Sequence, residues 1–147
     1  MIKSKTEIVV RYKETDQMGI VHHSNYFPWF EIGRADLFAL SGMTYFQVEE
    51  EGIMLPLVEA HANYGMGARY MDKLEILSYV GELSGAKVKF CYEVYRNGQR
   101  LCKGYTVHAF TTKELHAVNL KKANPKIWAL LSSLYSPEEA KAAMAAK

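Results

Sequence analysis

The chain has 147 residues, 49% of them hydrophobic, so it is long enough to bury the core of one ordinary globular domain. Its 18 basic and 16 acidic residues leave a formal net charge of +2, which excludes nucleic-acid binding by bulk electrostatics. No apolar run approaches the roughly 20 residues that cross a bilayer, and the first residues lack the apolar stretch of a signal peptide. We therefore expect one cytoplasmic domain, residues 1–147, with no membrane insertion and no nucleic-acid partner.

Three segments in the first half of the chain predict regular structure. Residues 5–13, KTEIVVRYK, alternate along the chain and are rich in β-branched residues, which is typical of a strand. Residues 25–40, NYFPWFEIGRADLFAL, are apolar on nearly every side and predict a buried helix with Pro28 in or beside its first turn. Residues 53–64 predict a second strand, and Pro56 favours a place at the edge of the sheet.

The clearest element is a hairpin formed by residues 86–96 and 100–111 around the turn residues Asn97 and Gly98. If these two residues form the turn, the numbers of facing residues sum to 195. The pairs on the core face are then Val94 with Leu101, Phe90 with Tyr105, and Val88 with Val107. The pairs on the other face are Lys87 with His108, Lys89 with Thr106, and Cys91 with Gly104.

The remaining segments complete the predicted fold. Residues 73–83 predict another strand, and residues 124–147 predict a short amphipathic helix followed by an Ala-rich end that frays from about residue 136. Cys91 and Cys102 are diagonal neighbours in the predicted hairpin, and this placement favours free thiols over a disulfide. The whole predicts an α+β fold, in which a five-stranded antiparallel sheet wraps around one long central helix, plus a short C-terminal helix.

Polar chemistry is concentrated in ETDQMGIVHHSNY, residues 14–26, between the first strand and the long helix. Asp16 follows the strand, Gly19 permits a tight bend, and the chain then enters a helix whose first backbone N–H groups lack helical partners. Those donors, including that of His23, can polarise a carbonyl oxygen while Asp16 acts on the carbonyl carbon or on water. Acyl transfer requires this division of labour. The alternative is that Asp16 only caps the helix or closes a turn.

The run RYKETDQMGIVHHSNYFPWFEIGR, residues 11–34, resembles the signature of the hotdog-fold acyl-CoA thioesterases. The similar branch contains 4-hydroxybenzoyl-CoA thioesterase and the cell-envelope-associated acyl-CoA thioesterases. Weaker resemblance continues through GARYMDKLEI, LSGAKVKF and HAFTTKE, so that it covers residues 5–120. The resemblance implies a single-domain hotdog fold and hydrolysis of an acyl-CoA thioester. Bulky apolar side chains around the helix favour an aliphatic or aromatic acyl group rather than a charged one.

The resemblance also implies roles for individual residues. Asp16 takes the place of the catalytic carboxylate, as nucleophile or general base, and His23 presents its backbone N–H to the thioester oxygen. Tyr12 matches a tyrosine implicated in the envelope-associated group. Further candidates in the motif are Gly19, Tyr26 and Glu31. No metal and no cofactor are expected, because coenzyme A is part of the substrate.

The 4-hydroxybenzoyl branch binds the CoA phosphates with a basic cluster, of which this chain keeps one charge in residues 84–87, SGAK. The expected substrate- and CoA-binding residues are Asn63, Arg69, Ser84, Lys87 and Lys89. The resemblance implies a homodimer, paired into a homotetramer as a dimer of dimers, with each active site at a subunit boundary. Residues 63–69 of a second copy would then line the pocket.

Several candidates have a structural alternative. Tyr12 shares the parity of the apolar residues in the first strand, so a place in the core is equally consistent with the sequence. Glu31 and Arg34 are three apart on the helix and can pair with each other. The side chains of Lys87 and Lys89 can simply lie on a solvated face of the sheet.

Two other functions remain open at this point. A hotdog dehydratase would act on hydroxyacyl thioesters without releasing a thiol, and a non-catalytic acyl-CoA binding or sensor protein would bind without turnover. A metal centre is disfavoured, because His22 and His23 are adjacent and no other histidine has ligand spacing to them. Thiol release separates the hydrolase from both alternatives.

Overall fold

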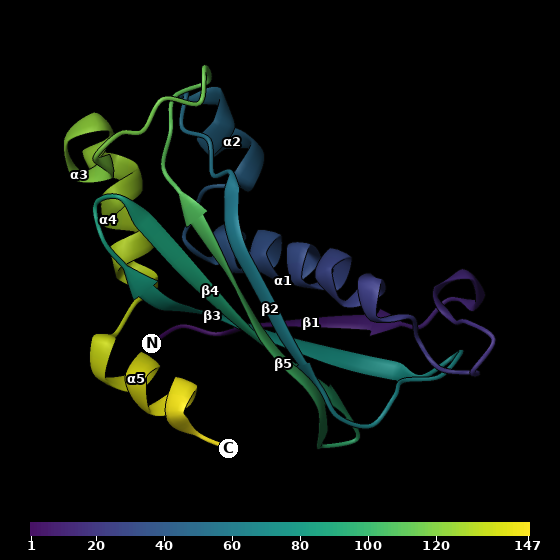
Figure 1. The fold of residues 1–147 in the computed structure, drawn as a ribbon. Helices are drawn as coiled ribbons and strands as arrows, with labels where there is room; N and C mark the ends of the chain where they lie inside the picture. Colours follow the sequence, from purple (N-terminus) through teal and green to yellow (C-terminus); the bar gives the residue numbers. More distant parts are fainter.

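The computed structural model describes all residues 1–147. The strands are β1 (Ser4–Val9), β2 (Leu57–Tyr64), β3 (Lys73–Leu83), β4 (Lys87–Arg96) and β5 (Gln99–Ala109). The helices are α1 (Tyr26–Leu40), α2 (Tyr45–Glu50), α3 (Leu120–Ala123), α4 (Pro125–Leu134) and α5 (Pro137–Ala145). Two short 3₁₀ turns, η1 (Tyr12–Glu14) and η2 (His23–Asn25), lie between β1 and α1. Figure 1 shows their arrangement.

The five strands form one antiparallel sheet in the order β1-β3-β4-β5-β2. This confirms the predicted α+β fold with five antiparallel strands. It also confirms the edge position of the strand that follows Pro56, although that strand begins at Leu57 and not at Ile53. The edge strand β2 pairs only with β5, so its other side presents unpaired backbone groups.

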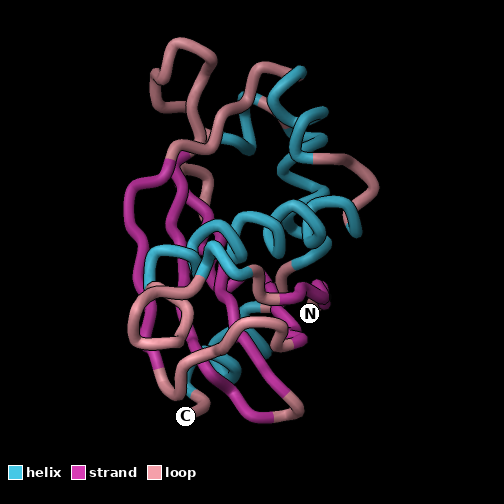
Figure 2. Tube along the Cα trace, turned by 90° about the vertical axis from the view of Figure 1, so that its right-hand side faces the viewer, coloured by secondary structure: helices cyan, strands magenta, loops and turns pink.

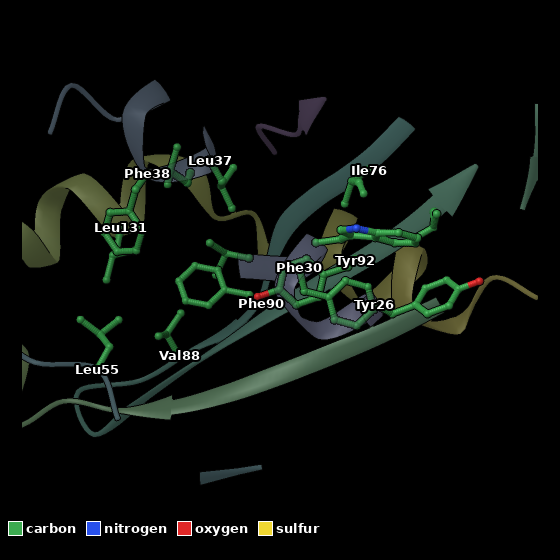
Figure 3. Close-up of a cluster of buried hydrophobic side chains, with 14 of the residues drawn as sticks. Tyr26, Phe30, Leu37, Phe38, Leu55, Ile76, Val88, Phe90, Tyr92 and Leu131 are labelled. Atoms are coloured by element: carbon green, nitrogen blue, oxygen red, sulfur yellow. The ribbon is translucent and has the colours of Figure 1, made fainter. Parts of the chain in front are cut away.

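The long helix α1 lies across one face of the sheet, as Figure 2 shows. It begins at Tyr26, and Pro28 falls within its first turn, where a backbone N–H is not needed for the helical ladder. Its buried face carries large apolar side chains that pack on β3 and β4 (Figure 3). The ring of Phe30 stacks on Tyr92 of β4, with the centroids 4.4 Å apart.

The helix covers only part of this inner face of the sheet. Its backbone lies close to β1, β3 and β4, and the far edge beyond β5 is left open. The register with β5 shifts between Leu57 and Glu59, and beyond this shift every second residue of β2 lies on the inner face, as Leu57 does before it. We call these residues the open strip: Leu57, Ala60, Ala62 and Tyr64. Leu57 is 56% exposed and Tyr64 is 46% exposed, so an apolar surface remains uncovered.

The β4–β5 hairpin has the predicted turn but a different register beyond it. Asn97 and Gly98 both have positive φ, as an Asn-Gly hairpin turn requires, and Tyr95 faces Arg100 as predicted. A β-bulge follows, and from Val94 onward each residue faces the one after its predicted partner. The pairs are Val94 with Cys102, Cys91 with Tyr105, Phe90 with Thr106, Lys89 with Val107, Val88 with His108, and Lys87 with Ala109.

This register shift overturns the predicted faces of β5. The predicted partners on the core face, Tyr105 and Val107, lie on the outer face and are partly exposed. Thr106 and His108, which were predicted on the polar face, are instead buried on the inner face. The alternation of apolar and polar residues does not reveal the bulge, because the one extra residue on β5 shifts every later pairing by one residue. The two cysteines are free thiols, as predicted.

The C-terminal segment forms two helices rather than one helix and a frayed end. The expected amphipathic helix is α4, and α5 follows it and packs against β3. Ala140 of α5 is fully buried, and the ammonium of Lys103 on the outer face of β5 donates to three carbonyl groups at the end of α5. The outer face of the sheet is therefore partly covered. No helix of the chain has both the length and the apolar character needed to cross a bilayer.

Candidate active site

Asp16 lies in a tight turn between η1 and η2. The turn is closed by an isolated β-bridge between Thr15 and Val21, and the N–H of Asp16 donates to the carbonyl of Ile20 at 3.0 Å. Asp16 Oδ1 accepts the N–H of Met18 at 2.8 Å, and Gly19 has a φ of +80°. Asp16 is thus a turn residue, as the structural alternative proposed, but its second carboxylate oxygen has no partner in the chain. Gly19 is required, because its positive φ would strain other residues.

Glu14, two residues before Asp16, ties this turn to helix α1. Its carboxylate is buried and accepts the N–H of Arg11 at 2.8 Å and the indole N–H of Trp29 at 2.9 Å. Its backbone carbonyl accepts the N–H of His22 at 2.9 Å and the side-chain amide of Asn25 at 2.9 Å. Burial raises the pKa of Glu14, but the bonds from Arg11 and Trp29 outweigh it and lower that pKa below the ordinary value.

The sequence alone does not mark Glu14 as a buried anchor, although it is the first residue of the polar stretch 14–26. Its signal would have been a carboxylate three residues after Arg11, but its burial depends on Trp29, which arrives from the helix. Asn25 also differs from a simple cap, because its side chain bonds to the loop and not to the first N–H groups of α1. The side chains of Glu14 and Asn25 therefore hold the loop against the helix, and the short 3₁₀ turn η2 leads into α1.

Three of the backbone N–H groups that precede α1 donate within the chain. Val21 N donates to the carbonyl of Ala68, His22 N to that of Glu14, and Ser24 N to Nδ1 of His22. The N–H of His23 has no hydrogen-bond partner within the chain. It lies three residues before Tyr26, the first residue of the helix, where the macrodipole adds partial positive charge. His22 Nδ1 also lies 2.7 Å from the hydroxyl of Ser24, so its ring is engaged locally.

Aromatic side chains surround the helix start. The hydroxyl of Tyr64, at the end of β2, donates to the carbonyl of His23 at 3.2 Å, and the ring of Tyr64 meets that of Tyr26. Tyr26 is buried. Tyr12 is 76% exposed in η1 and packs edge-on against Tyr70, so the alternative that placed it in the core is wrong. The exposed side chain of Tyr12 therefore lies beside the Asp16 turn, where a ligand can contact it.

The five expected substrate-binding residues do not gather at one site. Arg69 lies at the Asp16 turn, because a Cβ on Gly19 would stand 3.8 Å from its Nη1. Asn63 precedes Tyr64 on β2. The other three lie in or just before the first residues of β4, at its opposite end: Ser84, Lys87 and Lys89. Lys89 lines a cavity on the outer face of the sheet together with Asn63, away from the Asp16 turn. Since β4 has ten residues, about 30 Å separate the two ends.

The helix residues Glu31 and Arg34 do not pair. Glu31 is exposed and forms no ion pair, whereas Arg34 turns beneath the helix and donates to the hydroxyl of Tyr92 at 3.0 Å. The predicted alternative of a Glu31–Arg34 pair is therefore wrong, since a buried hydroxyl competes for the guanidinium. His23 is exposed and Asp16 is half-buried, so the turn lies at the surface of the chain.

These features combine a carboxylate with a free oxygen and an unpaired N–H at a helix start, the two components of acyl transfer chemistry. The sequence profile of the Thioesterase-like superfamily matches residues 10–129, which include the whole arrangement. The chain belongs to this superfamily. Its activity class is thioester hydrolysis, and its sheet and helix form the hotdog fold.

Three relatives of this thioesterase illustrate the match. A proposed acyl-CoA thioesterase of Bacillus subtilis, YneP, is 35% identical over 124 residues, covering 83% of this chain and 90% of that protein. The acyl-CoA thioesterase YbgC of Haemophilus influenzae is 29% identical over 135 residues, covering 91% and 88%. The crystal structure of a DHNA-CoA thioesterase from Staphylococcus aureus is 30% identical with a TM-score of 0.85, covering 90% of this chain and 91% of that one.

Proposed function

We propose that this thioesterase hydrolyses aliphatic or aromatic acyl-CoA to the free acid and coenzyme A, with Asp16 as its catalytic carboxylate. The observation that carries the proposal is that one tight loop contains both a free Asp16 carboxylate oxygen and the unpartnered N–H of His23. The names of the curated relatives support CoA as the carrier. The large apolar residues around α1 support an apolar acyl group.

In this mechanism the thioester carbonyl sits at the start of α1, with its oxygen towards the N–H of His23. Asp16 attacks the carbonyl carbon, and the developing oxyanion is stabilised by that N–H and by the helix dipole. The C–S bond then breaks, the CoA thiolate leaves, and water hydrolyses the mixed anhydride. In the second route Asp16 instead removes a proton from water, which attacks the same carbon. Both routes need the Asp16 carboxylate.

The remaining candidate residues take supporting roles in this proposal. Arg69, beside Gly19, attracts the phosphates or the pantetheine carbonyls of CoA. Tyr12, exposed next to the Asp16 turn, contacts the substrate at the mouth of the site. The distant residues Ser84, Lys87 and Lys89 reach an Asp16 site only if it belongs to another copy of the chain.

The assembly that we propose is a homodimer joined through β2, which pairs further into a tetramer. The support is the unpaired edge of β2 and the exposed apolar residues of the open strip beside it. A second copy would place its residues 63–69 against the open Asp16 surface. Light scattering during size-exclusion chromatography tests this: a monomer that remains fully active on dilution would contradict it.

The function is tested by thiol release from a panel of acyl-CoAs, from short to long chain and including benzoyl and phenylacetyl. Wild type and Asp16→Asn are compared, because Asn keeps the turn contacts but cannot act as nucleophile or base. The proposal predicts turnover that falls by a factor of about 10² to 10⁴ in the variant. Hydration or dehydration of a hydroxyacyl-CoA without thiol release would favour the dehydratase, and binding without any turnover would favour the sensor.

A further inference from the structure

Arg34 places a positive charge beneath helix α1 with no carboxylate to balance it. Its side chain forms no ion pair, and its Nε is buried without a hydrogen-bond partner. Its neighbours are the phenol of Tyr92 and the ring of Tyr45, whose centroid lies 5.8 Å from the guanidinium carbon. An arginine remains protonated in proteins, and a buried unpaired donor costs free energy. The chain therefore tolerates an unsatisfied cation at this place.

The guanidinium is held by a directed chain of hydrogen bonds. Arg34 Nη1 donates to the Tyr92 hydroxyl, which lies 2.7 Å from Thr106 Oγ1, and Thr106 Oγ1 lies 2.9 Å from His108 Nε2. His108 Nδ1 lies 2.9 Å from the carbonyl of Leu55 and must donate to it. Nε2 then accepts from Thr106, and Thr106 accepts from Tyr92. Every donor points away from Arg34, so the chain fixes the side chain without neutralising it.

Arg34 lies on the flank of α1 that leads from the helix start along the uncovered side of the sheet. Phe27, Glu31 and Arg34 stand at positions i, i+4 and i+7 and share this flank. The partners of Arg34 continue across the inner face to β5, and the open strip follows on β2. Along the axis, Tyr26 and Arg34 are about 12 Å apart, and helical side chains lean back towards the helix start.

We infer that Arg34 is a specificity-determining residue of this thioesterase, whose guanidinium binds a carboxylate or other hydrogen-bond acceptor at the distal end of a medium-length aliphatic acyl group. The inference rests on the proposed function, which places the thioester carbonyl at His23. From there the acyl chain follows the flank of α1 over Phe27 and ends at the unpartnered Nε of Arg34. The substrate class is thus acyl-CoA with an apolar middle and a polar end.

A second copy of the chain is a poorer source of the missing acceptor. The guanidinium points under the helix towards β4 and β5, and not outwards. The exposed carboxylate of Glu31 lies one turn nearer the helix start than Arg34. A carboxylate from a second copy of the chain would have to enter beneath α1 to contact Arg34.

Matched substrates test the inference. Octanoyl-CoA and suberoyl-CoA have the same carbon count and differ only in a terminal methyl or carboxylate, and decanoyl-CoA with sebacoyl-CoA extends the pair. For each pair, kcat/KM by thiol release is measured for wild type, Arg34→Met, Arg34→Lys and the control Arg100→Met. Arg100 is a partly buried arginine of β5 that pairs with Glu93. Melting temperature and oligomeric state are recorded for each variant.

We expect wild type to prefer the carboxylate-ended member of at least one pair by about tenfold, since a charged hydrogen bond contributes about 1.4 kcal/mol or more. Arg34→Met loses this preference, Arg34→Lys keeps part of it, and Arg100→Met keeps all of it. If Arg34→Met does not fold, Arg34→Lys decides. An unchanged preference ratio in the Arg34 variants, or a wild-type preference for the methyl-ended members, overturns the inference and leaves the proposed function standing. Wild type that hydrolyses no acyl-CoA overturns both.

Discussion

The two ends of strand β4 differ in how completely their polar groups are satisfied. At the Ser84–Lys89 end, the hydroxyl of Ser84 accepts the N–H groups of Ala86 and Lys87, and the ammonium of Lys89 pairs with Glu82 and lies over the ring of Tyr105. Helix α3 closes this end, since Leu120 N donates to the carbonyl of Gly85.

At the Asp16 end, a carboxylate oxygen and the N–H of His23 have no partner, and large apolar side chains face solvent. Tyr12 is 76% exposed, Met18 74% and Met71 61%. A surface with free donors and exposed apolar groups is suited to binding, whereas an end whose groups bond to one another is suited to stability. The difference predicts that substitutions at the Asp16 end change binding and turnover, whereas substitutions at the Ser84–Lys89 end change them little.

The largest effect on stability is expected for Glu14→Gln, at the Asp16 end. The amide cannot accept from Arg11 and Trp29 as the carboxylate does, so the loop loosens from α1. We expect the free energy of unfolding to fall by about 3 kcal/mol and kcat/KM to fall at least tenfold. Urea denaturation and thiol release measure the two quantities. The control is Glu7→Gln on β1, an exposed carboxylate without an ion pair, and equal behaviour of the two variants would contradict the role of Glu14.

The next effect concerns pH and His108, which faces Val88 near the Ser84–Lys89 end. Burial lowers the pKa of His108 from 6.5 to about 4. Between these values the unfolded chain binds the proton and the folded chain does not, so stability is full above pH 6.5 and falls as the pH drops to 4. The loss is on the order of 2 to 3 kcal/mol. Melting curves across this range should show the slope in wild type and lack it in His108→Asn.

A smaller effect is expected for Arg69→Ala, beside the Asp16 turn. Loss of one cation that holds the CoA moiety should raise KM about fivefold and leave kcat nearly unchanged, because such a contact is made equally in the ground state and in the transition state. Steady-state thiol release at two ionic strengths measures this, with Arg100→Ala as the control. A fall in kcat at constant KM would place Arg69 in the chemical step instead.

The smallest effect is expected for Lys89→Ala, at the opposite end of β4. Its ammonium is already paired with Glu82, so we expect KM to rise by less than about threefold. Measuring KM at decreasing enzyme concentration sharpens this prediction. If Lys89 binds the substrate of another copy, the rise in KM disappears when the assembly dissociates. A tenfold change would mean that the two ends act as one site.

The sequence predicted the elements that depend on local signals. Helix α1, the turn at Asn97 and Gly98, and the edge strand after Pro56 were all recognisable from periodicity and turn residues. Helix α2 carried a signal that was not used, the capping box of Thr44 and Gln47. Such features need only neighbours in the chain.

The features that the sequence did not predict depend on contacts between segments that are distant in the chain. The bulge in β5 moved Thr106 and His108 into the core, where they form a chain that begins at Arg34. Glu14 is buried only because Trp29 reaches it from the helix. Residue spacing alone does not predict these contacts. The sequence therefore pointed to the candidate Asp16 loop but not to the side chains that hold it.

The central claim is that chemistry belongs to the Asp16 end. Its most direct test measures turnover and binding together, for Asp16→Asn and Lys89→Ala, with the best acyl-CoA from the panel. The account predicts that Asp16→Asn binds this substrate with an unchanged Kd while kcat falls by a factor of at least about 10², and that Lys89→Ala keeps kcat. An Asp16→Asn enzyme with wild-type turnover would contradict the account.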